Sequence, residues 1–329
     1  MATPVTRRAH AKLNLALWVG AALPAGHEKA GFHPICSWMS CTDLFDEVTI
    51  EPLAAGAPSS LMIEWAADAP RPTPIDWPPE KDLALRALRA LEGHARRPLA
   101  ARVRVLKRIP VGSGLGGGSS DAAAALAALN EAFALGLTGA ELRSLAPALG
   151  SDVAFFIDDT APARPAIVSG LGERVERLPR VGADMILVVP PFSCATAPVY
   201  RAFDELEEEI KRSRASGGLP SAQRGETEDE SLVRLRAARA VERHRLEGRF
   251  LFNGLTAAAA RVEPRVRDLL STVANITNCH TRLTGSGSCV FLPVEAGYVE
   301  RVFEQLAGAI AGTAHPALAG CRAVRTRLL

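Results

Sequence analysis

A glycine-rich stretch at residues 109–130, IPVGSGLGGGSSDAAAALAALN, holds five glycines and three serines in front of an alanine-rich segment. That segment has helical composition from Ser119 onward, so the glycines form a loop that opens a helix. Such a loop presents free backbone N–H groups and the positive end of the helix dipole at one point. The stretch therefore predicts a phosphate-binding site, and we expect a methyl group added at Gly116 or Gly117 to intrude where the phosphate approaches.

Two familiar phosphate motifs do not fit this stretch. Gly112, Gly114 and Gly117 satisfy GxGxxG, but a dinucleotide fold would place that motif in its first strand–helix unit. It would also place an acidic residue about 20 positions later, at the end of a second parallel strand. Here the motif lies a third of the way along the chain, and the following helix runs on to Asn130 and Glu131. A Walker loop requires GK[ST], which the sequence lacks.

Transfer of a phosphate to an alcohol needs a carboxylate to accept the hydroxyl proton and cations to neutralise the phosphate charge. Asp152 is the candidate carboxylate because it follows the glycine stop at Gly150 and heads the apolar segment VAFF. Taken alone, it could equally be a plain N-cap. Lys12 is the candidate cation, and in the alternating pattern AKLNLALWV it shares one strand face with Asn14. Taken alone, it could be an ordinary exposed lysine.

Periodicity predicts the elements that would position these residues. Alternating or continuous apolar patterns predict strands at 11–19, 45–53, 61–65, 101–110 and 184–191. Helical patterns occur at 81–94, 119–135 and 138–149, the last with Thr138 and Glu141 as a capping box. We expect the strand at 184–191 to open a second domain, which divides the chain into residues 1–181 and 182–329.

Composition excludes several classes of protein. The 329 residues carry a formal net charge of +2 and an aromatic share of 5%, which gives no basis for nucleic-acid or anionic-membrane binding. The six cysteines form no CxxC pair and no histidine cluster accompanies them, so we expect reduced thiols in the cytoplasm. Lys12 and Asn14 interrupt the apolar stretch near the N-terminus, and we expect no targeting segment. A small-molecule enzyme is favoured, as a monomer or weak homodimer.

A stretch near 205–247 has a different composition from the rest of the chain. It is dense in mixed charge around a Ser-Gly-Pro centre. Such a composition predicts a solvated, disordered insertion between helix ends, whose middle, from about Arg214 to Asp229, buries too little apolar surface to be ordered. A partner-binding segment is the alternative.

Four motifs resemble, in their order and spacing, the GHMP kinase superfamily. They are AKLNLAL near the start, PVGSGLGGGSSDAAAAL in the middle, GSDVAFF about 30 residues later, and RLTGSGSCVFL near the end. The resemblance spans about residues 9–292 apart from the charged stretch. Within the superfamily, the forms AKLNL, GLGGGSSDAA and GSDV are similar to a branch whose acceptor alcohol carries cytidine diphosphate.

The resemblance implies an α+β, two-domain GHMP kinase fold. Residues 1–181 would form an ATP-binding and catalytic domain like ribosomal protein S5 domain 2, with a left-handed βαβ crossover. Residues 182–329 would form a ferredoxin-like, substrate-binding domain. The cleft between them would hold ATP and the acceptor, with Mg²⁺ as the metal cofactor.

The resemblance also assigns roles to single positions. It makes Lys12 and Asp152 the catalytic pair. The positions assigned to ATP are Lys107, Pro110, Val111, Gly112, Ser113, Gly114, Leu115, Gly116, Gly117, Gly118, Ser119 and Ser120. The positions assigned to the acceptor are Asn14, Phe32, His33, Thr196 and Tyr200. Among these, Phe32 and Tyr200 would sandwich the cytosine, and His33 would read its edge.

Three positions depart from the family pattern. Phe32 stands where tyrosine is usual, and FNGLT at 252–256 replaces the commoner NDLE. Asp82 stands where the family often has an asparagine, and because an aspartate has no amide to donate, it puts adenine recognition in doubt. The Mg²⁺ ligands are left open, with Ser119 and Ser120 plausible through their hydroxyl groups or bound water.

Two alternatives stay open. One is another GHMP small-molecule kinase, of the homoserine or mevalonate type, and the other is a nucleotide-binding regulator that has lost catalysis. Phe32, His33 and Tyr200 favour a nucleobase in the acceptor, which homoserine and mevalonate lack. Intact Lys12 and Asp152 argue against a regulator.

Overall fold

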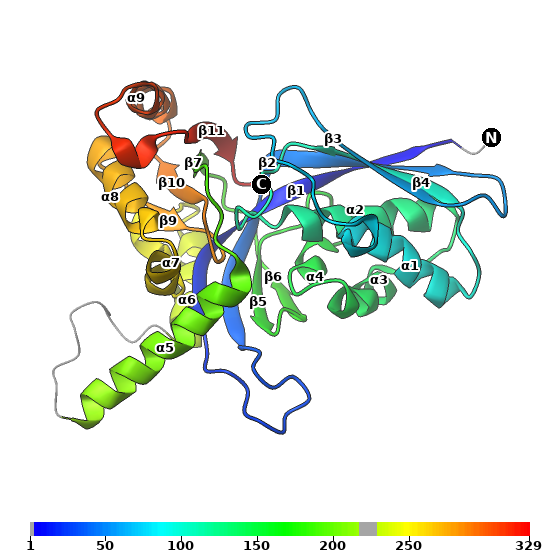
Figure 1. The fold of residues 1–329 in the computed structure, drawn as a ribbon, viewed down its shortest axis with the longest axis horizontal. Helices are drawn as coiled ribbons and strands as arrows, with labels where there is room; N and C mark the ends of the chain where they lie inside the picture. The colour runs from blue at the N-terminus through cyan, green and yellow to red at the C-terminus, as the bar shows by residue number, and fades with distance from the viewer. Residues whose placement is uncertain (1–2, 217–228) are drawn as a thin grey trace.

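The computed structural model of the chain describes residues 3–216 and 229–329 and contains two β-sheets, each covered by helices (Figure 1). In the first sheet the hydrogen-bonded order is β3-β4-β2-β1-β8, with β5 paired to β2 and β6 paired to β5. Its strands are β1 (Val5–Val19), β2 (Ile35–Pro52), β3 (Ser60–Trp65), β4 (Ala101–Lys107), β5 (Ala166–Gly170), β6 (Arg174–Arg177) and β8 (Phe252–Asn253). Lys12 thus lies on β1, which has a neighbouring strand on each side.

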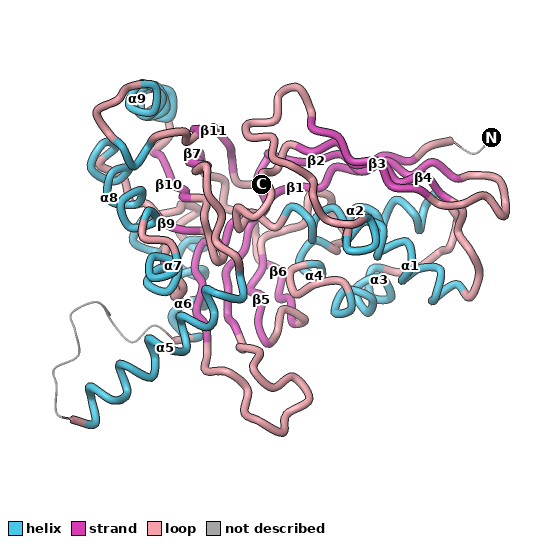
Figure 2. Tube along the Cα trace, in the orientation of Figure 1, coloured by secondary structure: helices cyan, strands magenta, loops and turns pink. Residues whose placement is uncertain are grey.

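One face of the first sheet is covered by helices, as Figure 2 shows. These helices are α1 (Leu83–Ala95), α2 (Gly117–Ala132), α3 (Gly139–Leu145) and α4 (Val153–Phe156). Leucines of α1 and α2 pack with valines and isoleucines of β2 and β4 in one buried cluster. Each fully buried aliphatic side chain of this kind stabilises the fold by about 1.5–3 kcal/mol. The alanine-rich face of α2 lets this helix approach both α1 and the sheet.

The expected elements are confirmed, with differences at the ends of strands and helices: β2 already begins at Ile35, and β4 ends at Lys107. The capping box of Thr138 and Glu141 is present at the start of α3. α2 begins at Gly117 rather than Ser119, because the left-handed residue Gly116 serves as its N-cap. The helix expected over 138–149 becomes α3 followed by a 3₁₀ turn at 146–148, where Pro147 cannot donate a helical hydrogen bond.

The second sheet has the order β11-β7-β10-β9, and its paired strands are antiparallel. Its strands are β7 (Asp184–Val189), β9 (Arg282–Leu283), β10 (Val290–Val294) and β11 (Arg322–Arg327). The accompanying helices are α5 (Thr196–Ala215), α7 (Thr256–Val262), α8 (Arg265–Thr277) and α9 (Val299–Ala311). Apart from β8, which belongs to the first sheet, the order along the chain is strand, helices, two strands, helix and strand, and the expected ferredoxin-like arrangement is confirmed. The left-handed sense of the crossover in the first part stays a prediction.

Most of the described residues of the charged stretch near 205–247 are helical, in agreement with an insertion that lies between helix ends. α5 continues to Ala215, and α6 (Glu230–Glu242) follows. Val233, Ala237 and Ala240 share one face of α6 and are buried against β1 and β2. Their spacing is the apolar stripe of a core-facing helix, which the surrounding charges hide in a composition count. Much of the segment expected to be disordered, residues 217–228, lies outside the described residues.

The two sheets contribute side chains to one shared hydrophobic core. Leu13 and Leu15 of β1 lie in the same buried cluster as Met185 and Leu187 of β7 and Phe291 of β10. β8 lies beyond residue 182 in the chain, yet it pairs in parallel with β1 of the first sheet. The boundary at 181/182 stays a prediction, because elements on its C-terminal side complete the N-terminal sheet.

The glycine loop docks against a second loop from the C-terminal part of the chain. The N–H of Cys289 donates to the carbonyl oxygen of Ser113 at 3.0 Å, and the Thr284 hydroxyl donates to the Gly114 carbonyl at 3.4 Å. Gly114 has a φ of +79°, and a Cβ there would collide with the Thr284 carbonyl oxygen. This close approach of two backbones requires glycine at position 114.

We predict that Gly114→Ala destabilises the protein more than Gly136→Ala does. Gly136 has a similar φ of +69° but no neighbour within 4 Å of a Cβ, so it isolates the backbone strain. That strain costs about 1 kcal/mol, and the collision at Gly114 adds roughly 2 kcal/mol. Urea unfolding of both variants measures the difference. Equal free energies of unfolding would contradict the docking.

Candidate active site

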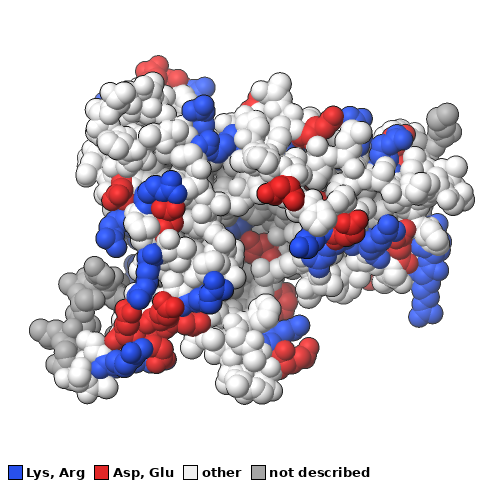
Figure 3. Space-filling model, viewed as in Figure 1, with Lys and Arg blue, Asp and Glu red and all other residues white. Residues whose placement is uncertain are grey.

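A cleft of about 550 Å³ opens between the two sheets, at a size typical of small-molecule sites. Figure 3 shows the cleft as a hollow near the middle of the face of the molecule that is turned to the viewer. β1, the glycine loop, the segment before α4, the first turn of α5 and the 285–286 turn all contribute to its walls. The expected site residues that line it are Lys12, Asn14, Lys107, Pro110, Val111, Gly112, Ser113, Gly114, Leu115, Gly116, Gly117, Gly118, Ser119, Asp152, Thr196 and Tyr200. The lining does not include Ser120, Phe32 or His33.

Lys12 and Asp152 come together in this cleft. Lys12 Nζ lies 3.4 Å from Asp152 Oδ2, and the side chains are 3% and 24% exposed. A buried ammonium is costly unless a counter-charge accompanies it, and Asp152 supplies that charge. Asp152 occupies the N-cap position of α4, but its side chain makes no capping hydrogen bond. The plain N-cap interpretation therefore loses its support, and the carboxylate is directed to Lys12.

Asn14 and the glycine loop hold Lys12 in place. Lys12 Nζ also donates to Asn14 Oδ1, while Asn14 Nδ2 donates to the Ser37 hydroxyl at 2.8 Å. The backbone N–H of Lys12 donates to the Leu115 carbonyl oxygen at 2.9 Å. A Cβ at Gly116 would lie 2.9 Å from Lys12 Cγ, so the loop packs directly on the lysine stem.

The glycine loop leaves the N-terminus of α2 open toward the cleft. In the described chain, no side chain caps this helix, and residues 117–119 of its first turn line the cleft. Unpaired N–H groups and the dipole of a helix of 16 residues favour an anion there. The expected obstruction by a methyl group is wrong at Gly117 and stays a prediction at Gly116. A Cβ at Gly116 would meet Lys12, and one at Gly117 would lie 3.0 Å from Ile109 Cγ2.

Lys107 lines the cleft but is held by two buried carboxylates. Its Nζ donates to Asp46 Oδ2 at 2.5 Å and to Asp121 Oδ2 at 2.7 Å. Asp46 Oδ1 in turn accepts from the backbone N–H of Ile109 at 2.8 Å, directly before the loop. Sequence reasoning missed both acids. Lys107 thus anchors the base of the glycine loop, and its contact with ATP stays a prediction.

The cluster of Lys107, Asp46 and Asp121 contains one more acid than base. Burial raises the pKa of Asp121 to about 8, and the neighbouring Asp46 adds to the rise while Lys107 opposes it. Asp121 Oδ1 is buried and has no hydrogen-bond partner among the described residues. At neutral pH Asp121 therefore keeps its proton, which leaves the cluster without net charge.

The opposite wall contains the residues expected to bind the acceptor. Thr196 Oγ1 lies 3.2 Å from Ser286 Oγ, a partner that sequence reasoning missed although the motif RLTGSGSCVFL contains it. The His33 ring lies 5.0 Å from the Tyr200 ring, and its Nδ1 lies 2.9 Å from the Gly20 carbonyl oxygen. Burial raises the pKa of Tyr200 to about 12, so its hydroxyl stays neutral.

His33 also contacts a charged side chain, whereas Phe32 lies outside the residues that line the cleft. His33 Nε2 lies 3.4 Å from Asp204 Oδ2 on α5. Phe32 is 59% exposed, so this ring presents its surface to solvent. Its assignment to the cytosine stays a prediction.

The two departures at 82 and 252–256 have structural reasons. Asp82 Oδ1 caps α1 by accepting from the Ala84 N–H at 2.9 Å, and Oδ2 accepts from Trp77 Nε1 at 3.1 Å. The carboxylate thus fixes Trp77 in the cleft wall. Asn253 Nδ2 donates to the Leu283 and Gly285 carbonyl oxygens, each at 2.8 Å, and so ties β8 to the turn beside the cleft.

Comparisons with known protein families and sequences identify relatives of the chain. Two family models match, the GHMP kinases N terminal domain at residues 82–160 and the GHMP kinases C terminal model at 233–311. A protein of Pelotomaculum thermopropionicum named 4-diphosphocytidyl-2-C-methyl-D-erythritol kinase is 35% identical over 87% of this chain and 88% of its own length. A protein of the same name from Caulobacter is 34% identical over 89% of this chain and 92% of its own length.

Solved structures include folds similar to that of the chain. The crystal structure of a 4-(cytidine 5'-diphospho)-2C-methyl-D-erythritol kinase is 26% identical and superposes with a TM-score of 0.64, covering 98% of both chains. The mevalonate kinase of L. major has a TM-score of 0.63 but only 14% identity, over 100% of this chain and 98% of its own. This second likeness shows the fold alone.

We predict that Asp121→Asn reduces the pH dependence of stability. The folded protein keeps the Asp121 proton up to about pH 8, whereas the unfolded chain releases it near pH 3.9. The folded state therefore binds the extra proton within this window, and the stability of the parent falls as the pH rises through it. Urea unfolding at about pH 5.5 and about pH 8.5 checks this.

An asparagine carries no proton to lose, so the Asp121→Asn variant should lose less stability between the two pH values than the parent does. The exposed Asp76→Asn variant is the control, and it should keep the pH dependence of the parent. A parent-like pH dependence in Asp121→Asn would show that Asp121 is ionised throughout.

Proposed function

Since the chain belongs to the 4-diphosphocytidyl-2-C-methyl-D-erythritol kinase family of the GHMP kinases, we propose that it phosphorylates that family's named substrate with ATP. The γ-phosphate would pass to the 2-hydroxyl group of 4-diphosphocytidyl-2-C-methyl-D-erythritol, giving the 2-phosphate and ADP in the non-mevalonate isoprenoid pathway. The observation that carries the proposal is the pair of Lys12 Nζ and Asp152 Oδ2, 3.4 Å apart beside the uncapped N-terminus of α2.

Asp152 accepts the proton of the acceptor hydroxyl in this mechanism. Its carboxylate lines the cleft and is not committed to a helix cap. Lys12 pairs with this carboxylate and stabilises the negative charge on the phosphoryl group in transfer. Asn14 aims the ammonium group, because its own amide is fixed by Ser37.

The ATP phosphates bind at the first turn of α2. Backbone N–H groups of residues 117–119 and the helix dipole receive the negative charge, and the Lys107 cluster below holds the loop in shape. Trp77, Asp82 and Leu83 extend the cleft beyond the loop, at a place suited to the nucleoside end of ATP.

The acceptor binds along the first turn of α5. Phe32 and Tyr200 stack on the cytosine, and His33 hydrogen-bonds to the edge of the base. Thr196 supports the same end of the substrate. The exposed ring of Phe32 and its place directly before His33 support this assignment. A nucleobase uses these groups, whereas the acceptors of homoserine and mevalonate kinases present no ring to stack.

Mg²⁺ fits the donor set of the cleft. Among the described residues, no group of three or more His, Cys, Asp or Glu side chains forms a ready-made metal site. The hydroxyl of Ser119 lines the cleft and is a hard oxygen donor of the kind that Mg²⁺ prefers, whereas Ser120 is 2% exposed and lies outside the lining. The ion would neutralise charge on the ATP phosphates.

The cytoplasm suits this protein. All six cysteines are free thiols, as in a reducing compartment. Within the described residues, no helix has both the length and the apolar character to cross a membrane. The partners that we propose are ATP and the cytidine diphosphate methylerythritol alone, with the chain a monomer or weak homodimer.

Steady ADP release with three acceptors tests the proposed function. We expect turnover with 4-diphosphocytidyl-2-C-methyl-D-erythritol and none above background with homoserine or mevalonate. Turnover of either of the other two, without the first, would reassign the protein to another GHMP kinase. ATP binding without turnover of any acceptor would support a regulator.

We predict that Asp152→Asn and Lys12→Ala each lower kcat about 100-fold or more. The dissociation constant for ATP should stay close to that of the parent, because the α2 N-terminus is unchanged. Asp159→Asn is the matched control, since this aspartate is exposed and lies outside the cleft lining. Near-normal turnover in Asp152→Asn would remove the assignment of Asp152 as general base.

A further inference from the structure

The helix that carries Asp152 is too short to hold its own position. α4 has 4 residues, Val153–Phe156, about one turn. Isolated helices shorter than about 12 residues are marginal in water, so surrounding contacts must fix this one. The placement of the Asp152 carboxylate relative to Lys12 therefore depends on groups outside α4.

The hairpin of β5 and β6 holds both ends of this segment. At the N-terminal end, Gly172 in the turn of the hairpin has a φ of +106°, and a Cβ there would collide with the carbonyl oxygen of Ser151. At the C-terminal end, one guanidinium nitrogen of Arg177 donates to the carbonyl oxygens of Phe155 at 2.7 Å and Ile157 at 2.9 Å. The hairpin thus contacts residues on both sides of Asp152.

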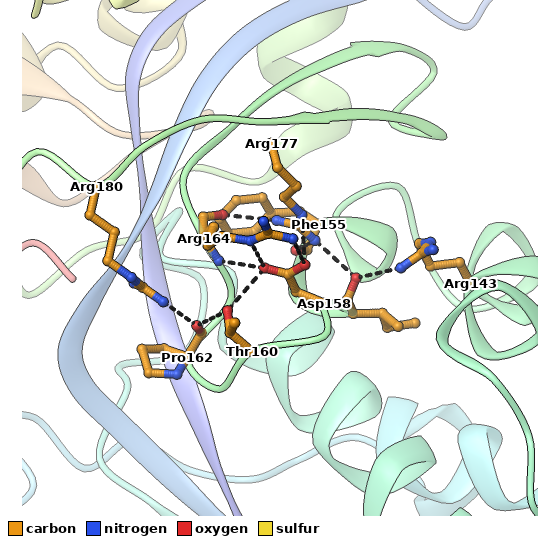
Figure 4. A network of polar contacts seen from close by, with 9 residues as sticks. Arg143, Phe155, Asp158, Thr160, Pro162, Arg164, Arg177 and Arg180 are labelled. Carbon is orange, nitrogen blue, oxygen red and sulfur yellow. Dashed lines mark hydrogen bonds and ion pairs between the residues drawn. The ribbon is translucent and has the colours of Figure 1, made fainter. Parts of the chain in front are cut away.

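Arg177 is itself fixed by a buried carboxylate. Figure 4 shows Arg164 and Arg177 converging on Asp158, whose side chain is 2% exposed. Burial would raise the pKa of Asp158, but its hydrogen bonds from Arg164 and the charge of Arg177 hold it well below the usual range. Arg143 adds a further hydrogen bond to the Ile157 carbonyl oxygen at 3.2 Å.

The hairpin also connects Asp152 to the strand that carries Lys12. β5 pairs with β2 from Ala166 to Gly170, and β2 pairs with β1, where Lys12 lies opposite Cys41. Arg177 stands at the end of β6, which pairs with β5. The same sheet therefore positions both Lys12 and Asp152. Lys12 lies on β1, and the segment of Asp152 is held by Arg177 of β6.

We propose that Arg177 is a positioning residue for phosphoryl transfer, which holds the carboxylate of Asp152 at its distance from Lys12 through the carbonyl groups of Phe155 and Ile157. The inference rests on the proposed function, in which Asp152 is the general base. Arg177 is not among the residues that line the cleft, so we expect it to act without touching a substrate. Its effect is on the transfer step and not on the binding of either substrate.

Kinetics of Arg177→Ala and Arg177→Lys test the inference. We expect kcat to fall at least 10-fold in Arg177→Ala, while both KM values and the ATP dissociation constant change less than about twofold. Guanidinium ion at millimolar concentration should restore part of kcat in Arg177→Ala. Arg177→Lys should be intermediate, because one ammonium cannot reproduce the planar donor fork.

Arg180→Ala is the matched control. Arg180 is exposed and donates to the Pro162 carbonyl oxygen at the edge of the same network, without touching residues 151–157. Its kcat should stay within about twofold of the parent. Gly172→Ala acts from the other end of the segment and should lower kcat in the same manner.

Hydrogen exchange gives a readout that needs no acceptor. Amide protons of residues 153–157 should exchange faster in Arg177→Ala, while those in the middle of α2 keep the protection of the parent. Parent-like exchange at 153–157, or a folded Arg177→Ala with the parent's kcat, would overturn the inference. A parent that turns over none of the three acceptors would instead refute the proposed function, so the two failures are distinguishable.

Discussion

The architecture of the cleft depends on the burial of one lysine. Lys12 is 3% exposed on a central strand, and a charge in that position requires an opposite charge and hydrogen-bond partners nearby. Asp152 and Asn14 supply them, and a glycine at 116 leaves space for the lysine stem. The positions of β1, the glycine loop and α4 consequently all depend on contacts with the side chain of Lys12.

Lys107 is a second buried lysine, and its surroundings give it a structural role, whereas those of Lys12 suit a chemical one. Lys107 is hydrogen-bonded to two buried acids, one of which, Asp121, keeps its proton at neutral pH, whereas Lys12 is paired with the cleft-lining carboxylate of Asp152. In the first cluster every charge is balanced internally and the arrangement holds the backbone of the loop. In the second, the carboxylate remains partly exposed to the cleft and can receive a proton. Two lysines on neighbouring parts of one sheet thus perform different tasks.

Local patterns in the sequence predicted most of the elements and the capping box at Thr138, whereas the pairing of Lys12 with Asp152 came from the family resemblance. They could not identify Asp46 as the partner of Lys107, because 61 residues separate the two and only the sheet brings them together. The direction of the missing side chain at Gly117 depends on packing against Ile109. The buried face of α6 was hidden because charges around Val233, Ala237 and Ala240 dominate the composition. Each of these features arises from tertiary contacts.

The parallel pairing of β8 with β1 limits how this molecule can open. β8 belongs to the C-terminal half of the chain, and Asn253 within it is hydrogen-bonded to the turn that meets the glycine loop. A rotation of one half away from the other would break this pairing, those hydrogen bonds and the shared apolar core together. The pairing of β8 with β1 and the shared core therefore oppose a hinge motion between the two halves of the chain.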